Sequence, residues 1–190
     1  MLLDGLIENY FFYFNHSLLY GADIKKLNSN KFKDVEINIA NGGDKKNILD
    51  LMDKRYREIL SKGFYAIVAK KNGEIIAYYP FIDYTMRKEC FFLDVKLKNK
   101  EIFGVQAWVH QDYRNKGIMT LMFKFFYDWA FEKGFKRHYG IMDYKNKRII
   151  KVVLNTLYPD EEFHIKFIVL FKKWKFFIRN DAHNRVSFTK

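Results

Sequence analysis

Cysteine is almost absent from this sequence of 190 residues, which contains Cys90 alone. A single cysteine excludes an intramolecular disulfide and a cysteine-ligated metal cluster, and it fits a reducing compartment. The start of the chain is apolar, but it lacks a basic leader and carries Asp4 and Glu8. Such a segment resembles neither a signal peptide nor a membrane-spanning helix. We therefore expect a soluble, cytoplasmic protein without a transmembrane segment.

Several catalytic and metal-binding patterns are also missing. The histidines are scattered along the chain at His16, His110, His138, His164 and His183. No set of His, Cys and carboxylate residues has a recognisable ligand spacing, so we expect no metal site. The sequence contains no serine nucleophile elbow and no P-loop. It also shows no internal repeat, linker or low-complexity tract, and its length fits a single domain over residues 1–190.

Hydrophobic, aromatic and basic residues are abundant instead. Hydrophobic residues make up 49% of the chain and aromatic residues 19%, which excludes disorder over most of its length. The formal net charge is +12, and residues 164–190 hold seven Lys or Arg against one acidic residue. This excess favours an anionic partner, such as an acidic small molecule, a nucleic acid or a membrane surface. A lysine-rich composition from an AT-biased genome explains the charge equally well, so charge alone does not identify the partner.

Hydrophobic periodicity and turn residues predict an alternation of strands and helices. We expect strands at residues 35–39, 64–70, 74–82, 91–97, 103–109, 135–142, 165–171 and 175–178, and helices at 3–13, 44–63 (capped by Asp44), 116–133 and 146–157. Asn72-Gly73 predicts a hairpin, because both residues accept a positive φ. The strand at 103–109, the helix at 116–133 and the strand at 135–142 form a βαβ unit, which implies parallel neighbours. Residues 1–32 are aromatic-rich, and we expect them to form a helical extension of the domain.

The most informative stretch is Val109-His110-Gln111-Asp112-Tyr113-Arg114-Asn115-Lys116-Gly117-Ile118-Met119-Thr120, between a predicted strand and a predicted helix. Unpaired backbone N–H groups in such a loop form an anion-binding concavity, and the helix N-terminus adds a positive partial charge. Arg114 and Lys116 add full positive charges. Gly117 falls in the first helical turn, where glycine costs about 1 kcal/mol relative to alanine. Close approach of a phosphate explains that glycine better than a simple turn does, although the turn stays an alternative.

This stretch resembles a known family. Arg114-Asn115-Lys116-Gly117-Ile118-Met119 is similar to the Arg/Gln-x-x-Gly-x-Gly/Ala signature of the GNAT superfamily of N-acetyltransferases, with Met119 where the family has Gly or Ala. Val109-x-x-x-Tyr113 resembles the lead-in to that signature, and the predicted order of elements resembles the family's from about residue 35 to residue 178. The resemblance implies an α+β acyltransferase fold. Its central sheet is mixed and mostly antiparallel, with a splayed parallel strand pair and flanking helices.

The resemblance also implies a binding site for acetyl-coenzyme A or another acyl-coenzyme A, without a metal. The pyrophosphate would be bound by Arg114, Asn115, Lys116, Gly117, Ile118, Met119 and Thr120, although Thr120 is equally able to bond only to its own helix. The pantetheine arm would contact Val109 and Asn146, and a plain helix N-cap is the alternative for Asn146. The backbone N–H of Ala107 would donate to the thioester oxygen, and an ordinary strand role is its alternative.

The acid and the base of the reaction are harder to place. Family members often have a tyrosine seven residues after the asparagine, as the general acid for the departing thiolate, but this chain has Val153 there. Tyr144 and Glu101 are the candidate catalytic side chains that we name near the expected cleft. A solvated surface position is the alternative for each of them. A base that acts through water would leave no signal in the sequence.

The function that the resemblance implies is direct transfer of an acetyl group to a primary amine in a ternary complex. The aromatic and basic residues around the expected acceptor pocket favour an anionic or sugar-like small molecule as acceptor. We expect no nucleic-acid partner, and a homodimer is one expected assembly. Two alternatives stay open. The chain could be a non-catalytic member that binds or senses coenzyme A, as Val153 and Met119 suggest, or a basic protein that binds nucleic acid or a membrane surface.

Overall fold

The computed structural model of the chain describes residues 12–28, 34–52, 56–57, 60, 63–85, 89–90, 93–170, 174–181 and 186–188. Its strands are β1 (Phe12–Asp23), β2 (Glu36–Ile39), β3 (Tyr65–Lys71), β4 (Glu74–Asp83), β5 (Glu89–Cys90), β6 (Leu93–Val95), β7 (Glu101–Gly104), β8 (Trp108–Val109), β9 (Arg137–Asp143), β10 (Glu161–Leu170), β11 (Trp174–Asn180) and β12 (Val186–Phe188). Its helices are α2 (Gly42–Leu51), α4 (Ile118–Glu132) and α5 (Lys147–Leu157), with a 3-10 turn, η1, at Gln111–Tyr113.

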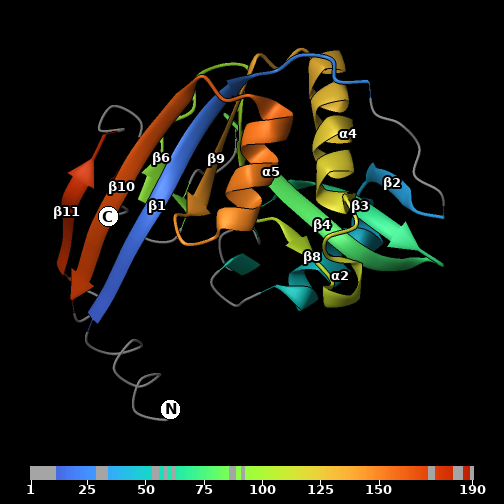
Figure 1. Ribbon diagram of the computed structural model, residues 1–190, viewed down its shortest axis with the longest axis horizontal. Coiled ribbons are helices and arrows are strands. Elements are labelled where there is room, and N and C mark those ends of the chain that lie inside the picture. The colour runs from blue at the N-terminus through green and yellow to red at the C-terminus, as the bar shows by residue number, and fades with distance from the viewer. Residues whose placement is uncertain are drawn as a thin grey trace, which may run out of the picture.

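Most strands belong to one nine-stranded sheet with the order β11-β10-β1-β9-β7-β4-β3-β2, in which β8 continues beside β4 (Figure 1). Strands β7 and β9 run parallel, whereas the other paired strands of this sheet are antiparallel. A smaller sheet has the order β12-β6-β5. The predicted α+β fold, with a mixed, mostly antiparallel sheet and one parallel pair, is therefore confirmed.

The two faces of the large sheet carry separate apolar clusters, because successive strand residues point to opposite faces. Tyr78 belongs to the cluster that includes Ile48 of α2, whereas Tyr79 belongs to the cluster that packs against α4 and α5. Figure 1 shows α4 and α5 next to each other across one face of the sheet. Strand β4 is covered on both faces and is buried from Ile76 to Asp83. The helices that follow β8 and β9 therefore cover the face of the sheet on which Tyr79 of β4 lies.

Local sequence signals located most of these elements. The hairpin between β3 and β4 is confirmed, with positive φ at Asn72 (52°) and Gly73 (83°). The βαβ unit is confirmed by the parallel pairing of β7 and β9 on either side of α4. The C-terminal hairpin is confirmed as antiparallel β10 and β11. The predicted strand at 91–97 is limited to β6, which belongs to the smaller sheet.

The predicted helical extension at the N-terminus is wrong where the structure describes it. Residues 12 and 13 of the expected helix belong to β1, and the earlier residues lie outside the described part of the chain. Strand β1 lies inside the sheet between β9 and β10. Leu19 packs on the α2 face, and its neighbours Leu18 and Tyr20 pack on the α4 face. A strand buried on both faces lacks alternation of apolar and polar residues, so its sequence is equally compatible with a helix.

The cap of α2 also differs from the prediction. Asn41 is the N-cap residue, and its Oδ1 accepts a hydrogen bond from the Asp44 N–H at 2.9 Å. The Asn41 N–H donates in return to Oδ2 of Asp44 at 3.1 Å, which completes a capping box. Asp44 is thus the third helical residue rather than the cap. Among the described residues, no helix is long and apolar enough to cross a membrane.

Candidate functional site

The loop before α4 has the conformation of an anion-binding turn. Asn115 and Gly117 have positive φ values of 63° and 76°, and Gly117 is the N-cap of α4 without a side-chain capping hydrogen bond. A Cβ added at Gly117 would meet no other atom within 4 Å, so the loop surface there is open. The first N–H groups of α4 therefore have no capping side chain and face a space that a ligand can enter.

Cationic side chains surround this loop. Arg114 is exposed, and its Nε donates to the carbonyl oxygen of Val109 at 3.0 Å, which positions its guanidinium group beside the end of β8. The Nζ atoms of Lys116 and Lys71 lie 5.4 and 5.8 Å from the centre of the Tyr113 ring. Both lysines thus bring positive charge close to Tyr113, the residue before Arg114, and this charge favours an anionic ligand at the loop.

The predicted strand at 103–109 is interrupted beside this loop. The parallel pairing of β7 with β9 ends at Gly104 and Gly140, and β8 pairs only with β4. Opposite β4, one extra residue falls between the Gly104–Phe81 pair and the Trp108–Tyr78 pair, which is a β-bulge. Because of the bulge, β8 stays paired with β4 but diverges from β9. A gap in the sheet opens at that point.

The backbone of Val109 faces this gap. The His110 N–H donates to the carbonyl of Ile76 at 2.8 Å. Hydrogen-bonded pairs alternate along an antiparallel ladder, so the neighbouring residue, Val109, directs its N–H and C=O away from β4. The bond from Arg114 to the Val109 carbonyl agrees with this direction. The Val109 N–H is therefore available to a ligand in the gap.

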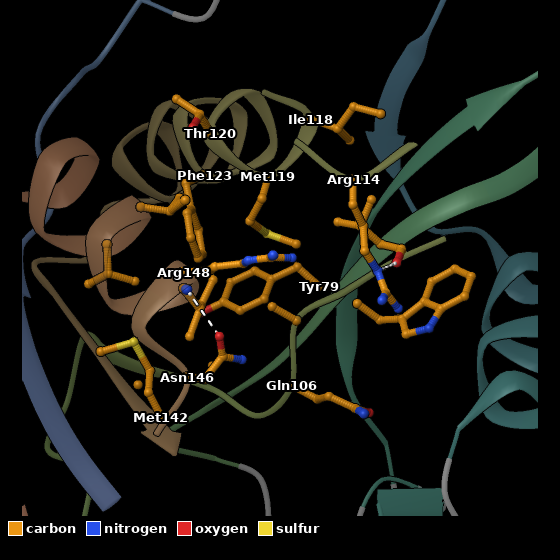
Figure 2. Close-up of a pocket in the computed structure, with 18 of the residues that line it drawn as sticks. Tyr79, Gln106, Arg114, Ile118, Met119, Thr120, Phe123, Met142, Asn146 and Arg148 are labelled. Carbon is orange, nitrogen blue, oxygen red and sulfur yellow. Dashed lines mark hydrogen bonds between the residues drawn. The ribbon is translucent and has the colours of Figure 1, made fainter. Parts of the chain in front are cut away.

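A cavity of about 590 Å³ joins the gap to the loop. Figure 2 looks into it, with Met119 and Thr120 of α4 on one side and Met142 and Asn146 on the other. Nine of the residues that the sequence predicts for the site line this cavity: Ala107, Val109, Arg114, Asn115, Gly117, Ile118, Met119, Thr120 and Asn146. The sequence did not single out Arg148, which also lines it. We call residues 114–120 the mouth of the cavity.

Asn146 caps a helix and also lines the cavity. It is the N-cap of α5, and its Oδ1 accepts a hydrogen bond from the Ile149 N–H at 3.3 Å, drawn as a dashed line in Figure 2. It also lines the cavity opposite α4. The cap places the amide at the cavity wall, where its NH₂ group can still donate to a ligand.

Three predicted residues do not line the cavity. Lys116 belongs to the mouth by its position in the chain, but its ammonium group lies over the Tyr113 ring and does not line the cavity. Glu101 is buried at the start of β7, opposite the splayed end, where its Oε2 accepts from the Lys98 N–H at 2.7 Å. Tyr144 follows β9, with the Lys147 Nζ 3.6 Å from its ring centre. In the described part of the chain, no three His, Cys, Asp or Glu side chains form a metal-binding group.

Two tyrosines form the inner end of the cavity. A Cβ on Gly104 would overlap the Tyr79 hydroxyl, and a Cβ on Gly140 would lie 2.5 Å from the Tyr20 hydroxyl. Both positions therefore require glycine, because the rings fill the space that side chains would occupy. Val153 is buried in the same apolar cluster and also lines the cavity. We call Tyr20, Tyr79, Gly104 and Gly140 the floor of the cavity.

Behind the floor, polar groups continue into the protein interior. The Tyr79 hydroxyl lies 2.7 Å from Nε2 of His138, and the Tyr127 hydroxyl lies 3.2 Å from Nδ1 of the same ring. Tyr20 shares a hydrogen bond with Tyr79. Burial lowers the pKa of His138 to about 3 and raises the pKa values of all three tyrosines. The four side chains are therefore uncharged near neutral pH.

Comparison with known proteins agrees with this geometry. The model of the acetyltransferase (GNAT) family matches residues 38–153, which is more than half of the chain. Among curated protein sequences, none matches the chain. Solved structures of similar fold include a GCN5-related N-acetyltransferase from Sphaerobacter thermophilus, with a TM-score of 0.59 and 8% identity over 93% of this chain and 56% of that one.

Two further solved structures show the same fold. A GNAT-family acetyltransferase from Colwellia psychrerythraea has a TM-score of 0.51 and 12% identity, over 99% of this chain and 61% of its own. A conserved protein of unknown function from Staphylococcus epidermidis has a TM-score of 0.52 and 14% identity, over 88% of this chain and 64% of its own. The chain thus spans between about half and two thirds of the length of these proteins. On the family match and the fold together, the chain belongs to the acetyltransferase (GNAT) family.

Proposed function

We propose that this protein is an acyl-coenzyme A-dependent N-acyltransferase that passes an acetyl group to the primary amine of a small molecule. The observation that carries the proposal is one continuous cavity. It connects an uncapped helix N-terminus, flanked by cations, to a splayed pair of parallel strands. The shape suits a long ligand with an anionic end and a neutral, hydrogen-bonding arm, and acyl-coenzyme A has this chemistry.

In this proposal, the mouth binds the pyrophosphate. The backbone N–H groups of residues 115–120 supply donors, while Arg114 and Lys116 supply charge. Met119 stands where the family signature has a small residue. It packs partly against the apolar cluster beneath α4, so its side chain extends along the cavity wall instead of over the open loop surface at Gly117. The larger residue is therefore compatible with phosphate binding.

The splay then positions the rest of the ligand. The free N–H of Val109 and the amide of Asn146 would hold the pantetheine arm from opposite walls of the cavity. The Ala107 N–H would donate to the thioester oxygen, where negative charge develops as the amine attacks. The amine nitrogen attacks the carbonyl carbon directly, the carbon–sulfur bond breaks, and no covalent intermediate with the protein forms. Glu101 and Tyr144 have no part in this scheme, because neither lines the cavity.

We infer that the acceptor is anionic or sugar-like, since the segments expected around it are aromatic and basic. These are α2, residues 82–93 and the β10–β11 hairpin, and part of them lies outside the described residues. A panel of amines tests the preference. Faster turnover of an amino sugar or an acidic amine than of spermine is the expected result. Equal turnover of spermine and an amino sugar would contradict the proposed preference for an anionic or sugar-like acceptor.

Calorimetric titration with acetyl-coenzyme A tests the proposed function. We expect micromolar binding by the wild type, and a loss of at least about 100-fold in affinity with Gly117→Glu. The new carboxylate repels the phosphates, and glutamate also resists the positive φ. Gly73→Glu is the matched control, because Gly73 has a similar φ of 83° and an equally open Cβ position, but lies in the β3–β4 turn. The proposal is contradicted if the Gly117→Glu variant still binds acetyl-coenzyme A. It is also contradicted if the folded wild type does not bind it.

A second candidate function has its own supporting observation. Val153 is 1% exposed within the apolar cluster and offers no proton to a leaving group, which favours a member that binds coenzyme A without catalysis. Acetyl-coenzyme A binding without acetylation of any amine in a broad panel would support this candidate. Salt-sensitive retention on heparin that coenzyme A does not change would instead indicate a charge-driven surface-binding protein. A single domain, a cytoplasmic location and a homodimer remain predictions.

A further inference from the structure

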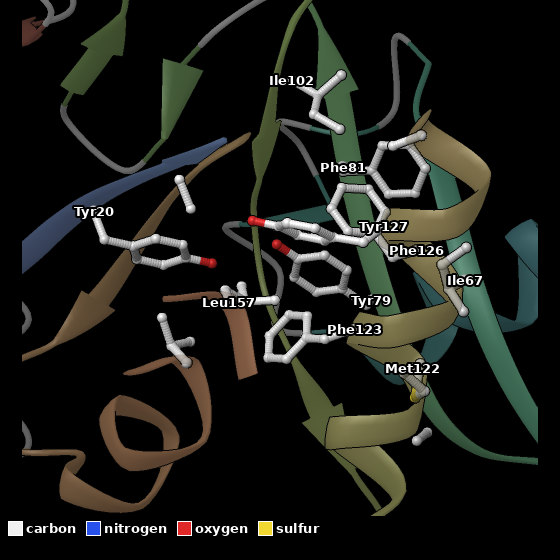
Figure 3. Packing of buried hydrophobic residues seen from close by; sticks show 14 of the residues in the cluster. Tyr20, Ile67, Tyr79, Phe81, Ile102, Met122, Phe123, Phe126, Tyr127 and Leu157 are labelled. Carbon is white, nitrogen blue, oxygen red and sulfur yellow. The ribbon is translucent and has the colours of Figure 1, made fainter. Parts of the chain in front are cut away.

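Four polar side chains form a buried hydrogen-bonded chain that ends at the floor of the cavity. In order they are Tyr20 of β1, Tyr79 of β4, His138 of β9 and Tyr127 of α4. Figure 3 shows the hydroxyl groups of the three tyrosines pointing toward one another. His138 is fully buried, and the three tyrosines are each at most 3% exposed. We call these four residues the tyrosine–histidine chain.

Counting hydrogens shows that this chain has one donor to spare. Each tyrosine carries one O–H hydrogen, and a neutral histidine carries one N–H hydrogen, so four hydrogens serve three hydrogen bonds. When the His138 hydrogen is on Nε2, it donates to Tyr79 and accepts from Tyr127 at Nδ1. Tyr79 then donates to Tyr20, and the spare donor is the Tyr20 O–H. The other tautomer reverses each bond and leaves the spare donor on Tyr127.

The two ends of the chain have different surroundings. Tyr20 lines the cavity, with its hydroxyl against Gly140, the last β9 residue that pairs with β7. Tyr127 does not line the cavity and is completely buried on α4. A ligand that carries negative charge at the floor would therefore hold His138 in the Nε2–H tautomer, because only that tautomer presents a donor to the cavity.

We propose that the Tyr20 hydroxyl, oriented by Tyr79 and His138, donates a hydrogen bond to the sulfur of coenzyme A as it departs from the acyl group. This inference rests on the proposed function. The floor lies at the splay, and the nearby helix position, Val153, has no donor for a leaving group. The structure thus places a donor from the sheet where the helix provides none.

The role is hydrogen-bond donation, not proton transfer. The bond between amine nitrogen and acyl carbon forms, the carbon–sulfur bond breaks, and the electron pair remains on sulfur. The amine proton goes to water, and the thiolate is protonated after it leaves the cavity. Burial raises the pKa of Tyr20, so this hydroxyl keeps its proton and remains a neutral donor throughout. Such a donor stabilises the developing charge without a change in its own charge.

The thiol pKa of bound coenzyme A measures this hydrogen bond without an acceptor substrate. Coenzyme A is bound to the wild type and to Tyr20→Phe, and the ultraviolet absorbance of the thiolate is followed against pH. A hydrogen bond to a charged group is worth about 1.5–3 kcal/mol, so the bound thiol should titrate about one to two pH units lower in the wild type. Arg114, Asp143 and Arg148 also line the cavity, but they are present in both proteins and cancel in the comparison.

Two more variants make the test specific. Tyr79→Phe interrupts the chain but keeps the Tyr20 hydroxyl, so a shift in the same direction as that of Tyr20→Phe, but no larger, is expected. Tyr139→Phe is the control, because it removes a buried tyrosine hydroxyl on the other face of β9, where that group accepts from Nε of Arg137 at 2.9 Å. The thiol of coenzyme A bound to this control should titrate as in the wild type.

The outcomes separate the two proposals. Equal thiol pKa values in the wild type and Tyr20→Phe, with coenzyme A bound to both, would overturn the donor role and leave the proposed function intact. Failure of the wild type to bind coenzyme A would overturn the proposed function, and the donor role with it. A shift as large in Tyr139→Phe as in Tyr20→Phe would show a general loss of packing instead of a hydrogen bond. Nuclear magnetic resonance of the His138 ring nitrogens adds an independent check, since bound coenzyme A should favour the Nε2–H form.

Discussion

The mouth and the floor of the cavity are built in opposite ways. The mouth is seven consecutive residues, exposed or partly exposed for the most part, and it uses positive charge and free backbone N–H groups. The floor combines residues from β1, β4, β7 and β9, is buried, and presents neutral hydroxyl groups against two glycines. One end of the cavity therefore depends on local backbone conformation, and the other depends on the correct register of four strands.

This difference predicts which property each substitution changes. A substitution at the mouth removes a ligand contact that the folded protein does not need for its own stability. A substitution at the floor disturbs packing that holds the sheet together and leaves buried polar groups without partners. Mouth variants should lose affinity and stay stable, whereas floor variants should lose stability first. The following experiments test that separation.

The largest effect is expected from Gly104→Ala. The new Cβ would overlap the Tyr79 hydroxyl, and the glycine is fixed between β4 and β9, so neither side can move easily. We expect the free energy of unfolding in urea to fall by about 3 kcal/mol. Gly42→Ala, at the open start of α2, should change it by no more than about 0.5 kcal/mol.

Measuring the effect of Gly104→Ala in a second protein, the Tyr79→Phe variant, tests the cause of the destabilisation. The overlap involves mainly the Tyr79 hydroxyl, so Gly104→Ala should cost less in a Tyr79→Phe protein than in the wild type. Equal costs in both backgrounds would show that the glycine is needed for another reason. A fully stable Gly104→Ala protein would contradict the description of the floor.

The next effect is the pH dependence of stability due to His138. Its pKa is about 3 in the folded protein, and the ordinary value for an unfolded chain is about 6.5. Between these values only the unfolded chain takes up the proton, so stability is complete above about pH 6.5 and is lost as the pH falls toward 3. His138 should contribute a slope of up to about 1.4 kcal/mol per pH unit to the free energy of unfolding.

His138→Gln isolates that contribution, because glutamine keeps a donor and an acceptor but does not titrate in this range. Urea unfolding of both proteins at several pH values between 4 and 7 gives the two slopes. The variant should be less stable near neutral pH, but its stability should depend less on pH. Parallel slopes for the two proteins would mean that His138 is accessible to protons in the folded state.

The smallest effect is expected at the mouth, from Arg114→Gln. Loss of one exposed guanidinium should weaken acetyl-coenzyme A binding by about 1 kcal/mol, or roughly fivefold, and should reduce the salt dependence of the affinity. The free energy of unfolding should stay within about 0.5 kcal/mol of the wild type. A destabilised Arg114→Gln protein with unchanged affinity would invert the proposed division between mouth and floor.

The position of the loop before α4 could be predicted from the sequence, for a physical reason. A strand, a glycine turn and a helix start follow each other within a few residues, so their signals are local. The structure accordingly has the start of α4 within the stretch from Arg114 to Thr120 and a helix cap at Asn146, and the role of these residues in ligand binding stays a prediction. The α+β architecture was also predictable, since most of the elements that form it have regular periodicity and clear turns.

The floor could not be predicted in the same way. Tyr20, Tyr79 and His138 lie far apart in the sequence, and each taken alone resembles an ordinary core residue. The sequence predicts a helix where β1 begins, so it does not predict that Tyr20 lies next to Tyr79. The available signals were Gly104 and Gly140, two glycines inside predicted strands, which mark a close approach of other groups. Which groups approach them depends on strand order, and strand order has no local signal.

The position of β1 has a consequence for biosynthesis. This strand is translated before both of its neighbours in the sheet, β9 and β10, because Phe12 pairs with Leu170 and Asp23 with Arg137. The apolar residues of β1 therefore stay unpaired until β9 and β10 have also been translated. Folding is expected to be slow because its closing step joins such distant segments. During that interval the nascent chain is exposed to aggregation, and a chaperone that holds the β1 segment should raise the yield of active protein.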